Sequence, residues 1–472
     1  MSPPELPDGW EASTIGDVTD RAGQRVPEPA EQFHYIDIGS IDRQTKRIVS
    51  PQALAGEIAP SRARQVVQAG DVLVSMTRPN LNAVAMVSTE LEGQIASTGF
   101  DVLRAVEVDP RWIFAAVRTP AFVTSMTELV QGALYPAVRP RDVRGFQLPI
   151  PPLNEQKRIA DKLDALVAWV DACRERLDRI PGILKRFRQS VLAAATSGEL
   201  TADWREERGL GMDWISSTFG EQGEVSGGLT KNSRRESLPL KRKYLRVANV
   251  YADRLELSDV QEIGLTQQEF DKTRLLVGDV LIVEGNGSRD QIGRAALWNG
   301  EVPDCSHQNH LIRWRSSESV LPRFAVAWLL SPNGRSLLVE RASTTTGLYT
   351  LSVSKVASIP IGVPTVAEQA EIIRRMDVLF ADLGRLESTF TEALKHTESL
   401  TPAFFAKAFR GELVNQDPED EPASVLLERI RAARAAETNA GRKGKRNGRR
   451  FQVIVESDAP DPEMAEAAAG AS

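Results

Sequence analysis

The chain of 472 residues contains one segment twice, and this repetition constrains its fold more than any other feature. Residues 151–200 align with residues 364–413 at a constant offset of 213 positions, without a gap. Both copies carry Glu-Gln near the start and close on Gly-Glu-Leu. The period is too long for a solenoid of short repeats. The sequence therefore predicts a duplicated domain, each copy followed by a copy of the same helix.

Looser matches precede each copy. Trp10, Ser13, Thr14 and Gly16 recur as Trp214, Ser217, Thr218 and Gly220, and Gly-Asp-Val-Leu occurs at 70–73 and again at 278–281. These regions consist of short apolar or alternating runs bounded by Gly, Pro and Asp, which indicate strands and turns. Residues 111–118 and 323–330 are predicted as short helices. Each of the two similar domains is therefore predicted to be α+β.

A heptad pattern follows each domain. The apolar gaps alternate four and three residues, which is typical of a coiled-coil seam. About 43 helical residues at about 1.5 Å each would make a rod of about 65 Å. Pro181-Gly182 is expected to kink the first helix and Pro402 the second. The predicted seam residues are Ile159, Leu163, Leu166, Val170, Leu177, Leu184 and Phe187 in the first helix, and Ile372, Met376, Leu379, Leu383, Leu386, Phe390 and Leu400 in the second.

The fold class predicted from this order is α+β, with two similar domains joined by two long helices that pack as an antiparallel coiled coil. The whole chain would then have an internal pseudo-two-fold repeat. The expected boundaries are 1–150 and 206–361 for the domains, 151–205 and 362–435 for the helical regions, and 436–472 for the tail. The tail is basic and then acidic, and it is expected to be disordered.

Composition excludes several classes of protein. The longest apolar run, 324–330, has seven residues, too few for a membrane-spanning helix. Residues 1–10 hold no apolar stretch, so no secretory signal is expected. Two cysteines make no disulfide framework, which favours a reducing cytoplasm. The net charge is −6, so nucleic-acid binding would have to come from local basic patches.

At 148–156 the chain reads Leu-Pro-Ile-Pro-Pro-Leu-Asn-Glu-Gln, and the helix that follows closes on Ser-Gly-Glu-Leu-Thr at 197–201. This phrase resembles the central conserved region of type I restriction–modification specificity subunits. The second copy, which ends at Phe409-Arg410-Gly411-Glu412-Leu413, resembles their distal conserved region. The resemblance covers about residues 8 to 435.

The resemblance implies a non-catalytic DNA-binding subunit whose two target-recognition domains, 1–150 and 206–361, each read one half of a bipartite asymmetric sequence. The helices would set the spacing and dock two methyltransferase subunits, and restriction–translocase subunits would complete the complex. S-adenosylmethionine, ATP and Mg would belong to those partners, with no cofactor in this chain. A rod of about 65 Å is close to two turns of B-DNA, so both domains could face one side of the duplex.

A basic cluster in the second half is the predicted phosphate contact, because such a cluster in an acidic protein suits phosphate neutralisation. The alternative is a solvated loop. The cluster consists of Lys231, Arg234, Arg235, Lys241, Arg242 and Lys243.

Two polar loops follow the Gly-Asp strands and are predicted to read bases, since Arg, Asn and Gln pair with guanine and adenine edges. A plain hairpin turn is the alternative. The candidates are Arg78, Asn80 and Asn82 in the first loop, and Asn286, Arg289 and Gln291 in the second. Arg139, Arg141 and Arg144 are candidates for phosphate contact, with salt bridging near the helix root as the alternative.

Cys305, His307 and His310 suggest a metal site, but a structural zinc needs four ligands and no fourth is nearby. No metal is therefore predicted. His307, Gln308 and Asn309 are interpreted instead as polar groups on a recognition loop.

Two rival classes remain. An enzyme would need a methyltransferase, phosphate-loop or nuclease motif, and none is present. A protein-binding coiled-coil scaffold would explain the helices, but it would leave the duplicated domains without a role. A modification-only complex that has lost restriction is a further alternative.

Overall fold

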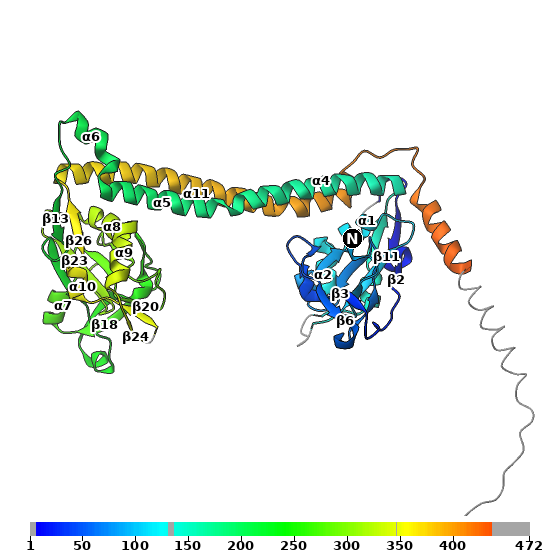
Figure 1. Ribbon diagram of the computed structural model, residues 1–472, viewed down its shortest axis with the longest axis horizontal. Coiled ribbons are helices and arrows are strands. Elements are labelled where there is room, and N and C mark those ends of the chain that lie inside the picture. The colour runs from blue at the N-terminus through cyan, green and yellow to red at the C-terminus, as the bar shows by residue number, and fades with distance from the viewer. Residues whose placement is uncertain (1–5, 131–135, 346, 437–472) are drawn as a thin grey trace, which may run out of the picture. The chain divides into compact units, whose positions relative to one another are not determined.

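The computed structural model describes residues 6–130, 136–345 and 347–436 (Figure 1). The chain forms two compact units. Unit 1 consists of Met1–Glu175 with Lys395–Ser472, and unit 2 of Arg176–Leu394. Each unit therefore combines one mixed helix-and-strand domain with segments of the long helices. Most of the predicted tail, from residue 437 on, lies outside the described residues.

Unit 1 is built on two four-stranded sheets, ordered β2-β11-β8-β9 and β6-β3-β10-β7, with the two-stranded pairs β1-β12 and β4-β5 beside them. Helices α1 (Pro110–Ala116), α2 (Pro120–Glu128) and α3 (Pro140–Arg144) follow the strands. The strands are β1 (Glu11–Thr14), β2 (Thr19–Arg21), β3 (Gln32–Ile36), β4 (Ile41–Asp42), β5 (Arg47–Ile48), β6 (Gln52–Ala55), β7 (Ala63–Val66), β8 (Val72–Ser75), β9 (Val84–Met86), β10 (Ile95–Ser97), β11 (Phe100–Ala105) and β12 (Gln147–Ile150).

Unit 2 repeats this plan. The sheet β14-β23-β19-β21 corresponds to β2-β11-β8-β9, and β18-β15-β22 to β6-β3-β10, while β13-β26 and β16-β17 match the two small pairs. The strands are β13 (Ile215–Thr218), β14 (Gly223–Gly227), β15 (Leu240–Leu245), β16 (Val250–Tyr251), β17 (Arg254–Leu255), β18 (Gln261–Leu265), β19 (Val280–Val283), β20 (Gly285–Asn286), β21 (Ala295–Leu297), β22 (Ser306–His307), β23 (Leu311–Ser316), β24 (Ser343–Thr345), β25 (Leu348–Thr350) and β26 (Pro360–Val363).

The described strands of unit 2 depart from this plan in two places. The sheet β18-β15-β22 has three strands where β6-β3-β10-β7 has four, and a further sheet follows β19, at a place where residues 131–135 of unit 1 lie outside the described residues. Strands β20, β25 and β24 form a three-stranded sheet after β19, at the place where the sequence predicts a base-reading loop. The helices of this unit's domain are α7 (Gln267–Thr273), α8 (Pro322–Leu330), α9 (Pro332–Arg341) and α10 (Val353–Ala357). The two domains therefore share a frame and differ at its edge.

The Gly-Asp-Val-Leu phrases mark the central strand of each domain. Every residue of β8 and β19 is buried, which explains their unbroken apolar runs. The aspartates before them, Asp71 and Asp279, are buried and paired with Arg104 at 2.7 Å and Arg315 at 2.7 Å. Each strand start is thus fixed by a partly buried ion pair.

Three long helices account for the two heptad regions. The first region is divided into α4 (Leu153–Asp178) and α5 (Ile180–Ser197), and the break falls just before Pro181, where a kink is predicted. The second is the single helix α11 (Val366–Ala408), which continues through Pro402. A short helix, α6 (Ala202–Glu207), follows α5. No helix in the described part of the chain is long and apolar enough to span a membrane.

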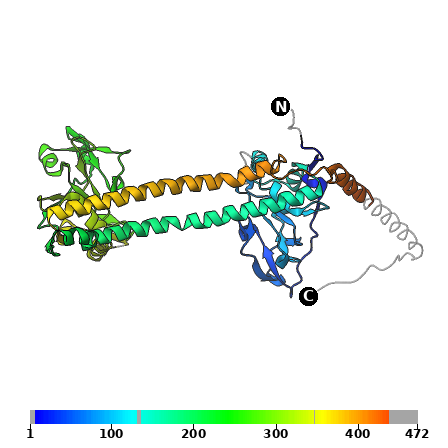
Figure 2. The same ribbon diagram turned by 90° about the horizontal axis from the view of Figure 1, so that it is seen from above.

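Within each unit the helix segments run antiparallel. In unit 2, α5 lies beside the first part of α11, with Arg188 paired to Glu387 at 3.7 Å and Arg375 donating to the Leu200 carbonyl at 3.0 Å (Figure 2). In unit 1, α4 and the last turns of α11 enclose a small hollow lined by Leu163 and other apolar side chains of both helices. The heptad pattern therefore corresponds to helix pairing inside each unit.

Most of the predicted seam residues are buried or half-buried, and two are exposed. Ile159, Leu163, Val170, Ile372, Met376 and Leu383 are buried, and Leu166, Leu177, Leu184, Leu379, Phe390 and Leu400 are half-buried. Phe187 and Leu386 instead remain 41% and 58% exposed. Helix α5 also packs on α8 and α9. Its buried side therefore faces the domain as well as α11.

The distal region, 362–435, is not one helix. After α11 ends at Ala408, residues 409–422 form turns and 423–436 form a second short helix. Ala423, Leu426, Leu427 and Ile430 of this helix are buried in the core of unit 1. The segment thus completes the first domain's core.

Candidate DNA interface

Both copies of the repeat attach the domain to the helix by the same two contacts. Trp10 donates from its indole to Glu155 at 3.0 Å, and Trp214 donates to Glu368 at 3.1 Å. The neighbouring glutamines are also buried and accept backbone N–H groups of the loops before α1 and α8, Gln156 from Asp109 at 2.9 Å and Gln369 from Leu321 at 2.7 Å.

The recurrence of Glu-Gln near the start of both helices does not by itself predict this anchoring role. The recurrence of Trp10 and Glu155 as Trp214 and Glu368 was the available signal. The contact itself joins residues far apart in the chain, so spacing could not reveal it.

The first polar loop follows β8 and contains both anchors and exposed groups. Arg78 and Asn82 adopt left-handed backbone angles, φ 49° and 44°, which are uncommon outside glycine. The Asn82 amide donates to the Val117 carbonyl at 2.8 Å, and Lys46 donates to the Asn82 carbonyl at 2.6 Å. Asn82 therefore holds the loop in place, while Arg78 and Asn80 are exposed.

The arginines around α3 divide in the same way. Arg144 is paired with Asp101 at 2.9 Å and donates to the Val102 carbonyl, so it has the salt-bridging role given as the alternative. Arg139 is exposed, and the side chain of Arg141 is 74% exposed. These two remain available for phosphate contact.

In unit 2 the basic cluster lies on the turn Ser233–Ser237 and on β15. Arg235 forms two hydrogen bonds to Glu269, at 2.9 and 3.2 Å, and lowers the pKa of that carboxyl. Arg242 lies over the Phe270 ring, 5.1 Å from its centre. Both arginines therefore hold the cluster against the domain, which does not fit their prediction as DNA contacts.

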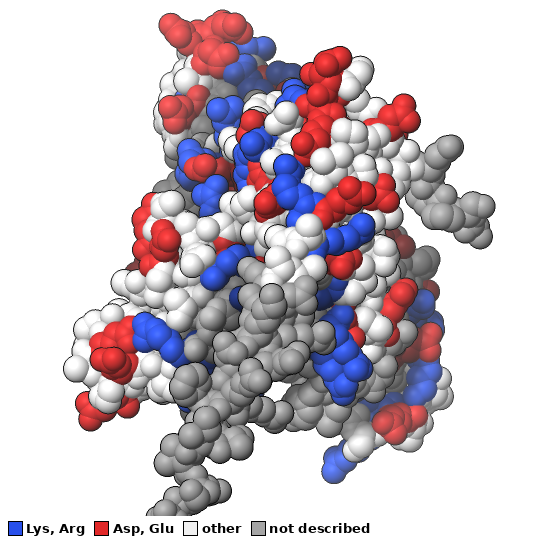
Figure 3. All heavy atoms as spheres, turned by 90° about the vertical axis from the view of Figure 1, so that its right-hand side faces the viewer, with Lys and Arg blue, Asp and Glu red and all other residues white. Residues whose placement is uncertain are grey.

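The other cations of the cluster face outward. Lys241 and Lys243 alternate with half-buried residues along β15, as expected for a strand with one exposed face, and Lys231 and Arg234 are exposed nearby. On the face of unit 1 seen in Figure 3, basic and acidic side chains are interspersed, so DNA attraction there would come from local clusters rather than from a broad field.

The second polar loop starts in β20, where Asn286 pairs with Tyr349 of β25 and accepts the Ser288 N–H at 2.9 Å. Arg335 of α9 supports the loop from behind by donating to the carbonyl of Asp290 at 3.2 Å. Arg289 and Gln291 are exposed. Like the first loop, this loop is fixed by its own domain and presents an arginine and an amide side chain outward.

The interpretation of His307 as a recognition-loop residue is wrong. His307 lies in β22, is completely buried, and bonds through Nδ1 to the Thr273 carbonyl at 3.1 Å. Burial lowers its pKa to about 4. Its counterpart by strand pairing is Ala96 of β10, because Ala96 pairs with Ile36 as His307 pairs with Leu245. Ala96 is buried as well, and only the strand pairing shows that the two positions correspond.

The neighbours of His307 carry no metal site either. Cys305 is buried, and burial raises the pKa of its thiol to about 12. Gln308 and Asn309 are half-buried, and His310 pairs with Glu284 at 3.0 Å. Among the residues that the structure describes, no three His, Cys, Asp or Glu side chains are grouped to hold a metal ion.

Comparisons with known proteins agree with this arrangement. Residues 7–181 match the family model described as type I restriction modification DNA specificity domain. The chain is 30% identical to the type I restriction enzyme EcoKI specificity subunit of Escherichia coli K12, covering 94% of this chain and 99% of that protein. It is equally similar to the StySPI specificity subunit of Salmonella potsdam, with the same coverage.

Solved structures give the same result. The HsdS subunit of Thermoanaerobacter tengcongensis is 26% identical and superposes with a TM-score of 0.60 over 87% of this chain and 99% of that one. A chain from a study of assembly and conformational transition of the type I R-M system is 27% identical, with a TM-score of 0.67 over 87% of this chain and 100% of that one. The chain belongs to the family of type I restriction–modification specificity subunits.

Proposed function

We propose that this chain gives a type I complex its DNA sequence specificity, with each domain reading one half of a bipartite, asymmetric site. The proposal is supported by a comparison of the two domains, which have the same contacts to the helices but different exposed loops. Trp10–Glu155 and Trp214–Glu368 attach the two domains in the same way, while the exposed loops that follow β8 and β19 differ in sequence and structure. Two domains with different contact loops suit an asymmetric target.

The helices are proposed to set the spacing between the half-sites. In this proposal α4 and α5 pair with α11 as one antiparallel coiled coil that joins the domains. A helix of 43 residues, the length of α11, is about 65 Å long, close to two turns of B-DNA. Lengthening or shortening the helices would then change the gap without changing either half-site.

We also propose that the helices dock two methyltransferase subunits. Large apolar side chains are exposed on helices that are otherwise paired, namely Trp169 of α4 at 62%, Ile183 and Phe187 of α5 at 52% and 41%, and Val378 and Leu386 of α11 at 54% and 58%. Aromatic and aliphatic side chains of this kind are the usual centres of protein interfaces.

Catalysis is assigned to the partner subunits. The methyltransferase subunits would transfer a methyl group from S-adenosylmethionine to adenine N6, and the restriction subunits would use ATP and Mg to translocate and cleave DNA. This chain would contribute target choice and positioning only.

The test is genome-wide mapping of adenine methylation in the source organism, with and without this gene. Deletion is expected to remove one bipartite motif, and exchange of residues 1–150 for those of another specificity subunit is expected to change one half of it. If every methylated motif survives the deletion, the proposal of an active modification complex is wrong.

A further inference from the structure

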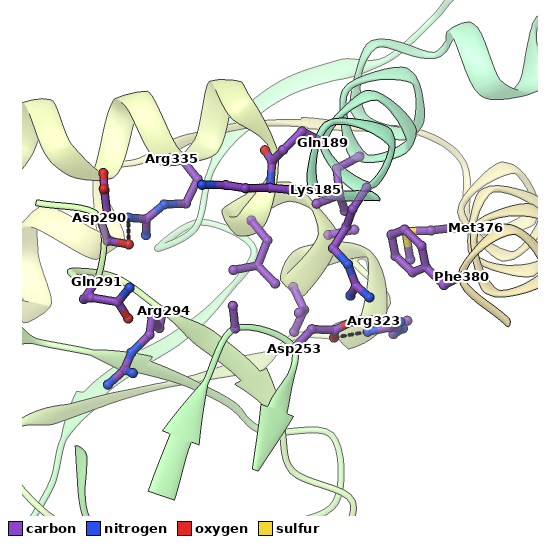
Figure 4. A pocket seen from close by; sticks show the side chains of 16 residues that line it. Lys185, Gln189, Asp253, Asp290, Gln291, Arg294, Arg323, Arg335, Met376 and Phe380 are labelled. Atoms are coloured by element: carbon purple, nitrogen blue, oxygen red, sulfur yellow. Dashed lines mark hydrogen bonds and ion pairs between the residues drawn. The ribbon is translucent and has the colours of Figure 1, made fainter. Parts of the chain in front are cut away.

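A cavity of about 530 Å³ lies in unit 2, between the helix pair α5 and α11 on one side and the domain on the other (Figure 4). One wall is apolar and consists of Leu192, Val326, Leu330, Met376 and Phe380. The opposite wall comes from the hairpin turn between β16 and β17, from α9 and from the loop that follows β20. A cavity of this size accommodates an organic molecule of the size of a nucleotide.

The polar lining is strongly basic. Five cations, Lys185, Arg188, Arg294, Arg323 and Arg335, face two carboxylates, Asp253 and Asp290. One of those carboxylates is already engaged, because Asp253 forms an ion pair with Arg323. The positive charge of the lining therefore exceeds its negative charge.

Three of the five cations form no ion pair with a carboxylate among the described residues, although the Asp290 charge acts on Arg335 and opposes the effect of burial on its pKa. Arg335 donates to backbone carbonyl oxygens only, including that of Asp290 at 3.2 Å (Figure 4). Arg294 reaches the Val247 carbonyl at 3.5 Å and lies 5.0 Å from the centre of the Tyr251 ring, and its Nε is buried without a hydrogen-bond partner. Lys185 projects from α5 toward Arg335. Burial lowers the pKa of the Arg294 and Arg335 guanidinium groups. Keeping both groups charged at this place therefore costs free energy of folding.

The helix positions that supply Lys185 and Arg188 to this cavity carry no cation in the other copy, where the matching hollow is lined by Lys46, Arg118 and Arg174 instead. At the offset of 213 residues, the four positions of α5 that line the cavity in unit 2 match four positions of α11 that line a hollow in unit 1. Both hollows also touch the same hairpin turn of their domain. The matched pairs are Lys185 with Glu398, Arg188 with Thr401, Gln189 with Pro402, and Leu192 with Phe405.

In unit 1 the protein's own side chains occupy the apolar part of this space. Arg118 lies between two rings, 4.8 Å from the centre of Phe114 and 4.9 Å from that of Phe405. The hollow at this wall measures about 10 Å³, and the part near the hairpin about 260 Å³. In unit 2 the smaller Val326, Leu330 and Leu192 stand where unit 1 has Phe114, Arg118 and Phe405, and the space is open.

We propose that the open cavity of unit 2 binds a phosphate-bearing organic anion of nucleotide size. The phosphates would lie among Lys185, Arg294 and Arg335, because guanidinium and ammonium groups converging from three elements suit a multiply charged anion. The organic part would lie on the apolar wall formed by Val326, Leu330 and Met376. The bound anion would bridge α5 to the loop at 288–294 and so restrain that loop against the helices.

The test is isothermal titration calorimetry of the full chain with ATP, with inorganic phosphate as the small-anion probe. ATP is expected to bind at least tenfold more tightly than inorganic phosphate. Lys185→Glu, which installs the residue of the other copy, and Val326→Phe, which fills the apolar part without changing charge, are each expected to weaken ATP binding at least tenfold. Arg186→Gln is the matched control, because Arg186 is the next residue of α5, is exposed, and does not line the cavity.

Circular dichroism of each variant establishes that it is folded. Hydrogen exchange of the peptide spanning 286–294 is expected to slow when ATP is added to the wild-type chain and to be unchanged in Lys185→Glu.

The proposal is overturned if ATP does not bind at millimolar concentration, or if it binds the two cavity variants as tightly as the wild-type chain. It is also overturned if ATP binding is unchanged in Lys185→Glu while this substitution weakens DNA binding equally for all sequences, since the cavity cations would then serve a DNA phosphate. The titration contains no DNA, so its result is independent of the test of the proposed function.

Discussion

Glu155 and Glu368 hold the same position in the two copies of the repeat, yet among the described residues Glu368 alone of the two forms an ion pair with an arginine. Each accepts an indole hydrogen bond, from Trp10 at 3.0 Å and from Trp214 at 3.1 Å. Glu368 also pairs with buried Arg205 and accepts a bond from Thr201 at 2.9 Å. At the matching positions of unit 1 the chain has Pro418 and Val414, so Glu155 keeps one buried oxygen without a hydrogen-bond partner, and burial raises its pKa.

The two carboxylates should therefore respond differently to neutralisation. Glu368→Gln is expected to destabilise the protein by about 3–5 kcal/mol, since it leaves the charge of Arg205 buried without its partner. Glu155→Gln is expected to change stability by less than about 1 kcal/mol, because the amide keeps the Trp10 bond and removes a buried charge. Urea unfolding of both variants at pH 7.5 measures the difference. Equal losses would contradict the assignment of different partners to the two residues.

Protonation of His307 should destabilise unit 2 in mild acid. Burial lowers its pKa from 6.5 to about 4, so between these values the unfolded chain binds more protons than the native chain. The contribution of neutral His307 to the free energy of unfolding is fully present above about pH 6.5. It decreases as the pH falls toward 4, by up to about 3 kcal/mol in total. His307→Gln should flatten this part of the pH profile in urea unfolding. An unchanged slope in His307→Gln would show that other groups cause it.

Lys241 and Lys243 should contribute affinity for DNA without sequence preference. Replacing both by Ala is expected to weaken binding equally for all sequences and to reduce the slope of log K against log salt by about 2, one for each phosphate contact. Fluorescence anisotropy across a salt series measures this slope. Arg374→Ala, an exposed cation of α11, is the control that should leave the slope unchanged. A loss confined to one target sequence would identify these lysines as base contacts instead.

Arg289 and Arg78 should each affect one half of the recognition site. An arginine that pairs with a base edge contributes about 1–3 kcal/mol of discrimination. Arg289→Ala is therefore expected to relax the half-site read by unit 2, and Arg78→Ala the half-site read by unit 1. Binding selection from a randomised duplex library reports both. If either variant weakens every sequence uniformly, that arginine contacts phosphate.

Trp169 should be a contact for the methyltransferase subunit. Its side chain is 62% exposed on α4, and truncation of a central aromatic contact typically costs more than 2 kcal/mol of binding energy. Trp169→Ala is expected to weaken co-purification with the methyltransferase subunit by more than tenfold. Leu129→Ala, which removes an equally exposed apolar side chain outside the helix pair, should have no effect. The reverse result would place the interface on the domain surface.

Sequence reasoning was most successful where the signal is periodic or repeated. The duplication predicted two mixed domains of the same topology, and the heptads predicted the long helices that follow them. It failed where a residue's environment depends on distant segments. Phe187 fits the heptad pattern but faces outward because α5 also packs on α8 and α9. His307 looks like a loop residue, but β22 pairs with β15 and buries it.

The family, the order of the elements and the two polar loops after matching strands follow from residue identity and spacing, which are properties of the chain alone. Which polar side chains are exposed depends on how the chain packs. Arg235, Arg242 and Asn82 are bound by Glu269, Phe270 and the Val117 carbonyl, while Lys243, Arg289 and Arg78 are exposed. A charged or amide group bonds to any partner that folding brings within about 3 Å. These partners lie up to 35 positions away in the chain, so sequence spacing does not reveal which side chains they hold.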